Sequence, residues 1–289
     1  MMYFLLALAA IPLALFSYAV FIGRTNFQLR TAKIELGLEK PIRILHVSDL
    51  HFRAGQRKKV RFLQKLSLLN PDLVVNTGDN LGGVGQEEAT ARALKPLLNL
   101  PGAFVFGGND YRGPIFKNPL GYLTKPSGKK TSPQLDSEKL AELMSGWSNL
   151  NNSSESVDLG GVSLRLIGLD DPHEQYDNPR KLQKSIKKNE AELTIGVVHA
   201  PYHRAIQELA LQGAQVVLAG HTHGGQVCLP GGKALTTNCD LPVEYAKGVS
   251  SWIFDGQSVE LHVSAGLGTS IYAPFRLFCP PEATLIEIH

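Results

Sequence analysis

Five short apolar segments, each followed at once by a cluster of Gly, Asp, Asn or His, constrain the fold of this 289-residue chain most. They are residues 42–47, 73–76, 103–106, 193–198 and 215–219. Each is short and bounded by turn-forming residues, which is typical of buried strands. The segments 60–69 and 87–95, between the first three, have helical patterns. Such alternation of strand and helix predicts a layered α/β domain.

The end of the chain has a different pattern. Residues 251–254 and 258–263 flank Asp255-Gly256, a dipeptide that favours a tight hairpin turn. A last apolar segment, 283–288, has the length of one more strand. We therefore expect antiparallel pairing to be added to the alternating part.

The first 23 residues contain no charged side chain. At about 1.5 Å per residue, a helix of this length crosses roughly 30 Å of hydrocarbon. We therefore predict a transmembrane anchor at 1–23, a linker at 24–40 and a catalytic domain at 41–289. A cleaved signal peptide is the alternative, but the basic segment that such a peptide needs is missing.

Basic residues follow this apolar segment, and none precedes it. Arg24, Arg30 and Lys33 lie just after it. The positive-inside rule therefore predicts a single-pass membrane protein whose catalytic domain lies in the cytoplasm, with an exported form as the alternative.

The polar clusters after the five strands contain residues that bind metals. They are Asp49 and His51, Asp79, Asn109 and Asp110, His199, and His221 and His223. In an open α/β sheet, ligands bind outside the carboxyl ends of the strands, so these clusters should meet in one crevice. One Asp-x-His or His-x-His motif alone is weak, but five such endings in order predict a single site.

The residue types indicate which metals such a site would hold. Carboxylate, imidazole and amide ligands suit Mn, Fe or Zn. Cys228, Cys239 and Cys279 lie too far apart to suggest a thiolate site or a disulfide framework. Two Asp, one Asn and four His exceed the needs of one tetrahedral ion. Two divalent ions that share a carboxylate, about 3.5–4 Å apart, account for the number.

The order Asp-x-His, Gly-Asp, Gly-Asn, His, Gly-His-x-His resembles the calcineurin-like metallophosphoesterases over roughly residues 41–289. With its apolar N-terminal segment and Gly-His-Thr-His-Gly-Gly-Gln, the chain is similar to the bacterial membrane-associated or exported branch. The resemblance implies an α/β, four-layer sandwich of two mixed β-sheets flanked by helices. It also implies two ligand sets that share Asp79. One ion would be held by Asp49, His51, Asp79 and His223, and the other by Asp79, Asn109, His199 and His221.

The resemblance further implies a reaction. A hydroxide held between the ions would attack phosphorus in line, while the ions neutralise the phosphoryl oxygens. In most relatives a His that is thought to protonate the leaving group follows the Asn of the third cluster, but here Asp110 takes its place. We predict Asp49, Asn109 and Asp110 as catalytic residues.

The source of the leaving-group proton is open at this stage. A carboxylate near two cations stays ionised and donates protons poorly, so Asp110 could instead orient a water. Tyr111, His173 or His203 could supply the proton, or the leaving group could need none. The segment 170–173 could border the pocket, although a structural turn at Pro172 is the favoured interpretation.

These observations predict a metal-dependent phosphoesterase at a membrane surface. Its substrate would carry a phosphodiester, pyrophosphate or phosphomonoester bond, for example in a lipid or a nucleotide-linked lipid precursor. The net charge of +3 gives no strong sign of nucleic-acid binding. The alternative, suggested by Asp110, is a metal-binding scaffold of the same fold with little catalysis.

Overall fold

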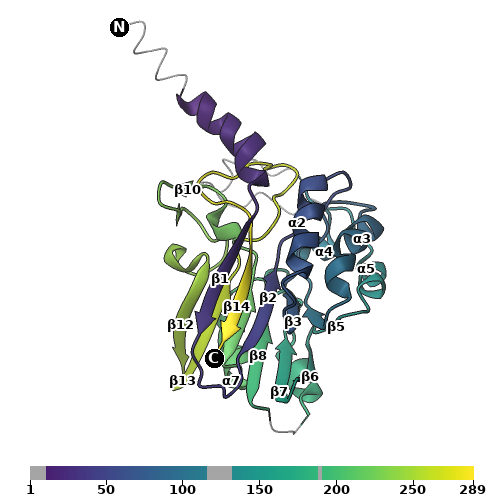
Figure 1. Ribbon diagram of the computed structural model, residues 1–289, viewed down its shortest axis with the longest axis vertical. Helices are drawn as coiled ribbons and strands as arrows, with labels where there is room; N and C mark the ends of the chain where they lie inside the picture. Colours follow the sequence, from purple (N-terminus) through teal and green to yellow (C-terminus); the bar gives the residue numbers. More distant parts are fainter. Residues whose placement is uncertain (1–10, 116–131, 188–190) are drawn as a thin grey trace, which may run out of the picture.

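The computed structural model describes residues 11–115, 132–187 and 191–289, and its centre is formed by two six-stranded sheets (Figure 1). The first sheet has the order β1 (Gln28–Ile34), β14 (Glu282–Ile288), β2 (Ile42–Val47), β3 (Leu73–Asn76), β4 (Gly102–Phe104) and β5 (Ser148–Asn149). The second has the order β12 (Gly248–Phe254), β13 (Gln257–Val263), β9 (Val216–Ala219), β8 (Leu193–Val197), β7 (Val162–Gly168) and β6 (Ser153–Leu159). A small ribbon pairs β10 (Cys228–Leu229) with β11 (Lys233–Ala234).

Both sheets are mixed, which confirms this part of the predicted architecture. Strands β2 to β5 run parallel, while β14 is antiparallel to β2 and parallel to β1. In the second sheet β7, β8, β9 and β13 are parallel, and β6 and β12 each add an antiparallel edge. The turn at Asp255-Gly256 joins β12 to β13 as a hairpin, as predicted.

Helices flank the sheets. They are α2 (Arg57–Ser67), α3 (Glu87–Leu98), α4 (Gly108–Tyr111), α5 (Ser137–Leu143), α6 (Pro179–Ser185) and α7 (His203–Leu211). The chain also forms the π-helix η1 (Tyr18–Ile22) and the short 3₁₀ helices η2 (Gly23–Thr25), η4 (His223–Gly225) and η5 (Val243–Tyr245). Helix α3 continues through Pro96, past the predicted end, and Leu97 in its last turn is fully buried in the core.

Three apolar layers hold the strands and helices together. Alternate residues of β2 face opposite sides, so Ile44 lies in the core between the sheets and Leu45 in the core under α2, α3 and α5. A third core lies under α6 and α7 and includes Leu182 and Leu209. Because both faces of the central strands are covered, their sequences are mostly apolar rather than alternating, although β2 also contains Arg43 and the buried His46.

The segment before the domain differs in part from the prediction. Residues 24–40, which we predicted to be a linker, contain β1, whose seven residues all pair with β14. Its polar, mostly exposed sequence QLRTAKI is that of an edge strand and gives little apolar signal. The first sheet therefore includes residues from Gln28 onward.

Among the residues that the structure describes, no helix is both long and apolar enough to cross a membrane. Residues 1–10 of the predicted anchor at 1–23 lie outside the described residues. The anchor therefore stays a prediction.

Candidate metal centre

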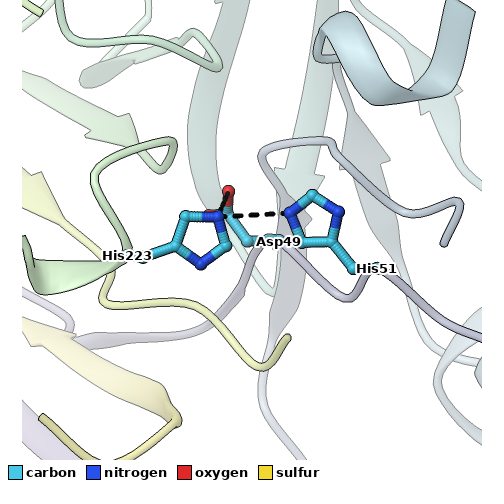
Figure 2. Close-up of side chains that lie close together, drawn as sticks. All are labelled: Asp49, His51 and His223. Atoms are coloured by element: carbon cyan, nitrogen blue, oxygen red, sulfur yellow. Dashed lines mark hydrogen bonds and ion pairs between the residues drawn. The ribbon is translucent and has the colours of Figure 1, made fainter. Parts of the chain in front are cut away.

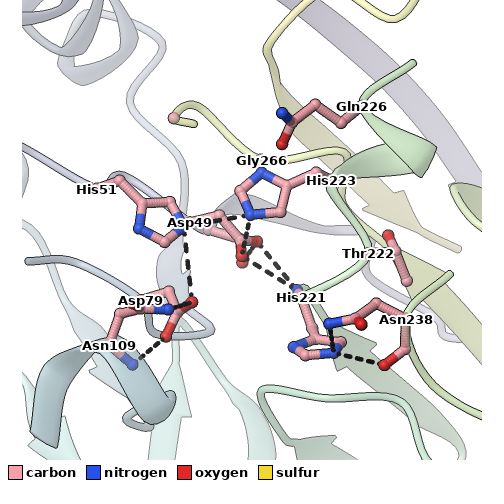
Figure 3. Close-up of polar contacts among 12 residues, drawn as sticks. Asp49, His51, Asp79, Asn109, His221, Thr222, His223, Gln226, Asn238 and Gly266 are labelled. Carbon is pink, nitrogen blue, oxygen red and sulfur yellow. Dashed lines mark hydrogen bonds and ion pairs between the residues drawn. The ribbon is translucent and has the colours of Figure 1, made fainter. Parts of the chain in front are cut away.

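Both sheets contribute to one cluster of polar side chains at the carboxyl ends of their strands (Figure 3). Asp49 and His51 follow β2, Asp79 follows β3, and Asn109 lies in α4, which begins four residues after β4. From the second sheet come His199, after β8, and the pair His221 and His223, after β9. The structure places all seven predicted metal ligands at this end of the sheets, with Nε2 of His221 at 3.2 Å from the carbonyl oxygen of Asn238. Their role as ligands stays a prediction.

The first half of the cluster is formed by Asp49, His51 and His223 (Figure 2). Nε2 of His51 lies 3.2 Å from Nε2 of His223, which lies 3.6 Å from Oδ1 of Asp49. Two imidazole nitrogens and a carboxylate oxygen therefore face one point, with Asp49 fully buried. This donor set fits a divalent ion of the Mn, Fe or Zn type.

The second half contains Asp79, Asn109, His199 and His221. Oδ2 of Asp79 lies 3.4 Å from Nε2 of His199 and accepts a hydrogen bond of 2.6 Å from Nδ2 of Asn109. The same oxygen lies 3.6 Å from Nε2 of His51, so Asp79 touches both halves. Nε2 of His199 is buried and has no hydrogen-bond partner within the described part of the chain. A buried imidazole nitrogen without a hydrogen bond is consistent with a metal ligand.

Neighbouring groups fix the orientation of several of these side chains. Nδ1 of His199 lies 2.7 Å from the carbonyl oxygen of Thr77, to which it donates, so Nε2 is left for the cluster. The hydroxyl of Ser48 donates to Oδ2 of Asp49 at 2.6 Å, and the backbone N–H of His221 donates to both oxygens of the same carboxylate. Such support is typical of metal ligands.

The backbone at the cluster is strained. Five of the seven predicted ligands have positive φ: Asp49 (49°), His51 (38°), Asp79 (54°), His221 (70°) and His223 (51°). This conformation costs roughly 1–3 kcal/mol at a residue other than glycine and is concentrated at functional sites. Gly78 and Gly220 provide the space: a side chain on Gly220 would collide with Ser48, and one on Gly78 would lie 2.5 Å from a backbone nitrogen. The strained backbone directs the side chains of these five predicted ligands toward the cluster.

Burial and mutual interaction shift the ionisation of the cluster. Burial raises the pKa of Asp49 to about 6, against the opposing effect of His199. Although burial raises it, the neighbouring His199 holds the pKa of Asp79 well below its usual value. Burial would lower the pKa of His199, but Asp79 holds it well above its usual value. Burial lowers the pKa of His51 to about 4 and that of His221 to about 3, so both imidazoles are neutral at pH 7.

Asp110 takes a different position from the ligands. Its fully buried carboxylate accepts hydrogen bonds from the backbone N–H groups of Asn80, Leu81 and Gly107 at 2.7, 3.2 and 3.1 Å. Burial, reinforced by Asp79, raises the pKa of Asp110 to about 7. These contacts anchor the loops after β3 and β4 to each other. A direct part for Asp110 in catalysis stays a prediction.

The other predicted proton donors differ in their distance from the ligands. The ring of His173 lies 4.8 Å from that of His221, centroid to centroid, and its Nδ1 is 2.9 Å from the hydroxyl of Tyr202. The hydroxyl of Tyr111 donates instead to Asp170 in the loop after β7. His203 packs against the aromatic side chains of β12. Of the three, only His173 has a ring contact with a predicted ligand among the described residues.

Two buried basic residues, Arg276 and Lys59, lie behind the first half. Arg276, 1% exposed, donates to the carbonyl oxygens of Ala265 and Gly268 at 2.7 and 2.8 Å, and its Nη2 lies 3.2 Å from Nδ1 of His223. Lys59 donates to a carbonyl oxygen in the loop after β2, and burial lowers its pKa to about 7. Lys59 belongs to a basic run after the first ligand cluster, whereas Arg276 lies in no motif, so the sequence offers no signal for Arg276.

Comparisons with known proteins agree with this geometry. The pattern of the calcineurin-like phosphoesterase family matches residues 42–225, which contain all seven predicted ligands. YpbG of Bacillus subtilis is 28% identical over 252 residues, covering 86% of this chain and 81% of that protein. The UDP-2,3-diacylglucosamine pyrophosphatase LpxG of Chlamydia muridarum is 27% identical over 293 residues, covering 85% of this chain and 83% of LpxG.

A solved structure supports the fold. The NAD nucleotidase NadN of Haemophilus influenzae superposes with a TM-score of 0.50 at 16% identity, over 79% of this chain and 46% of that chain. At this identity the likeness concerns the fold alone. The family match, the two mixed sheets and the cluster of ligands lead to one conclusion: the chain belongs to the calcineurin-like phosphoesterase family and is a metal-dependent phosphoester hydrolase.

Proposed function

We propose that this protein uses two divalent ions to hydrolyse a phosphodiester or pyrophosphate bond at a membrane surface. The observation that carries the proposal is the contact of Asp79 Oδ2 with His51 on one side and His199 on the other. One carboxylate between two groups of nitrogen ligands is the arrangement that a pair of ions requires. Asp49 and His223 complete the first half, and Asn109 and His221 complete the second.

The residues and the ions would have separate tasks. Bound ions would supply Lewis-acid chemistry, lowering the pKa of a water nucleophile and neutralising charge on the phosphoryl group. The carboxylates of Asp49 and Asp79 would balance the positive charge of the ions. The hydrogen bond from Ser48 holds Asp49 in position, and the hydrogen bond to the carbonyl oxygen of Thr77 holds His199. His173, beside His221, would contact the leaving group. A scaffold without catalysis is less well supported, because every predicted direct ligand is present in the cluster.

The chemistry of a relative suggests the substrate class. LpxG is named for the cleavage of a pyrophosphate bond in UDP-2,3-diacylglucosamine, and it aligns with 85% of this chain. We infer a nucleotide-linked lipid or a similar amphipathic phosphate ester as the substrate. The predicted anchor at 1–23 would hold the domain next to such a lipid.

The full chain, purified in detergent and supplied with Mn²⁺, tests the reaction. We expect turnover of bis(p-nitrophenyl) phosphate and of UDP-2,3-diacylglucosamine, with loss of both after treatment with EDTA and recovery when Mn²⁺ is added back. Faster turnover of the UDP-linked lipid than of UDP-glucose would support the lipid assignment. Equal activity before and after complete metal removal would contradict a two-metal reaction.

A further inference from the structure

Asp171, which our sequence analysis assigned to a structural turn, has an unusual environment. It lies in the loop after β7 and is fully buried. Oδ1 accepts a hydrogen bond of 3.0 Å from the backbone N–H of His173, while Oδ2 has no hydrogen-bond partner within the residues that the structure describes. A buried carboxylate oxygen left unpaired is costly, so such a group requires an explanation.

Two consecutive glycines place this oxygen next to the second half of the metal centre. A Cβ atom on Gly108 would lie 3.2 Å from Oδ2 of Asp171. A Cβ atom on the preceding Gly107 would collide with Oδ1 of Asp79 and lie 2.6 Å from Cδ2 of His199. Asp171 and the Asp79–His199 pair therefore lie against the same short stretch of backbone, immediately before Asn109.

The second half of the centre also contains a buried polar atom that lacks a hydrogen bond within the described part of the chain, Nε2 of His199. Like this nitrogen, Oδ2 of Asp171 is buried without a hydrogen-bond partner in the described residues. The loop that carries Asp171 is held close by His173, whose ring contacts that of His221, and the ring of His221 lies 5.3 Å from that of His199. A carboxylate oxygen and an imidazole nitrogen, both buried and both without a hydrogen bond among the described residues, thus border one small region, in which the nitrogen also lies 3.4 Å from Oδ2 of Asp79.

We propose that Oδ2 of Asp171 is an additional ligand of the ion in the second half. The inference rests on the proposed function, since it presupposes that this half binds an ion. A carboxylate oxygen is a suitable donor for Mn, Fe or Zn, and a bound cation would compensate a buried charge that is otherwise unpaired. Gly108 allows the arrangement, because any larger residue would crowd Asp171. This half then offers two carboxylates, Asp79 and Asp171, to a divalent ion.

The isosteric substitution Asp171→Asn tests this directly, with Mn²⁺ binding measured by isothermal titration at pH 8. We expect the affinity for the ion of the second half to fall at least about tenfold, in line with the 10–100-fold effects of disturbing metal-site groups. In metal-free protein the same substitution removes an unpaired buried charge, so its Tm should rise. A merely structural carboxylate would lower the Tm in both states.

Glu174→Gln is the matched control. Glu174 also borders Gly108 and carries the same charge, but its side chain is 36% exposed. It should leave both Mn²⁺ affinities within about twofold, as expected of a screened surface charge. Should Asp171→Asn bind two ions as tightly as the unmodified chain, the inference is wrong, whereas the proposed function stands. An unmodified chain that binds no Mn²⁺ would overturn both.

Gly108→Ala offers a second approach that keeps the carboxylate. The added methyl group would lie 3.2 Å from Oδ2 of Asp171 and equally close to Cγ of Glu174. The side chain of Glu174 is partly exposed and can move aside, whereas the buried Asp171 should be displaced from its present position. We expect a fall in the second-half affinity that does not add to that of Asp171→Asn in the double variant, because the two changes act through one contact. Fully additive losses would contradict the proposed contact.

Discussion

The two halves of the metal centre differ in the groups that stand behind their ligands. Behind the first half lie the buried cation Arg276 and the buried amine Lys59, whose pKa burial lowers to about 7. Behind the second half lie acceptors: the carbonyl oxygen of Thr77, 2.7 Å from His199, and the buried carboxylate of Asp171. A divalent ion is therefore repelled by the surroundings of one half and attracted by those of the other.

The difference between the two halves also determines which ring nitrogen carries the proton in His223 and in His199. A guanidinium can only donate, so the contact of Arg276 with Nδ1 of His223 leaves the proton of a neutral imidazole on Nε2, which faces His51 and Asp49. His199 has the opposite arrangement, because its Nδ1 donates to a carbonyl oxygen. His199 thus directs Nε2 toward the second half and binds an ion once its additional proton is lost, whereas in the first half the proton on Nε2 of His223 must move before His223 can bind one.

Removing the bridge should have the largest effect, because it disables both halves. Asp79→Asn should lower the rate of bis(p-nitrophenyl) phosphate hydrolysis on the order of 10³-fold or more, since indirect support of a ligand alone is worth 10–100-fold. Steady-state kinetics with saturating Mn²⁺ measure this. Asp72→Asn, an exposed position far from the cluster, serves as the control. If the Asp79 variant kept a tenth of the activity, the bridge would not be essential.

The dependence of metal affinity on pH comes next in size. Burial raises the pKa of Asp49 to about 6, and Asp79 holds that of His199 well above its usual value, so both groups must lose a proton before they bind metal. Mn²⁺ affinity should therefore rise with pH from 6 to 8, by up to about tenfold per unit for the proton of His199, with a smaller contribution from Asp49 near pH 6. Competition with a fluorescent chelator at pH 6, 7 and 8 checks this. An affinity that stays level or falls would contradict it.

The two ions should also leave in sequence. Because cations stand behind the first half, a chelator titration should remove its ion first, with the two affinities differing by about tenfold, or roughly 1.4 kcal/mol. His223→Gln should retain the tighter site and His199→Gln the weaker one. Equal affinities, or a tighter site in the His199→Gln variant than in the His223→Gln variant, would contradict the proposed difference between the two halves.

The smallest effect on metal binding is expected when the hydrogen bond that Ser48 donates to Asp49 is removed. The hydroxyl of Ser48 donates to Asp49 at 2.6 Å and accepts from that of Thr77 at 2.6 Å. Ser48→Ala should weaken Mn²⁺ binding in the first half by up to about tenfold and leave the second half unchanged. Isothermal titration measures both, with Ser67→Ala on α2 as the control. A loss confined to the second half would reverse our assignment.

The sequence predicted the position of those polar residues that directly follow buried strands. The clusters after β2, β3, β8 and β9 were predictable because buried strands have a clear apolar pattern and turns follow them directly. Strand β1 was missed because an exposed edge strand has little such pattern. Arg276 was missed for another reason, and Asp171 was named only as a residue that could border the pocket. Both lie in irregular segments, and their significance depends on tertiary contacts that no local spacing reveals.

The most direct test of the central claim is a crystal structure of the full chain grown with Mn²⁺, with anomalous scattering used to locate the ions. We expect two anomalous peaks about 3.5–4 Å apart on either side of Asp79. One peak would lie beside His51 and His223 and the other beside His199 and His221. A single peak, or peaks away from these side chains, would contradict it.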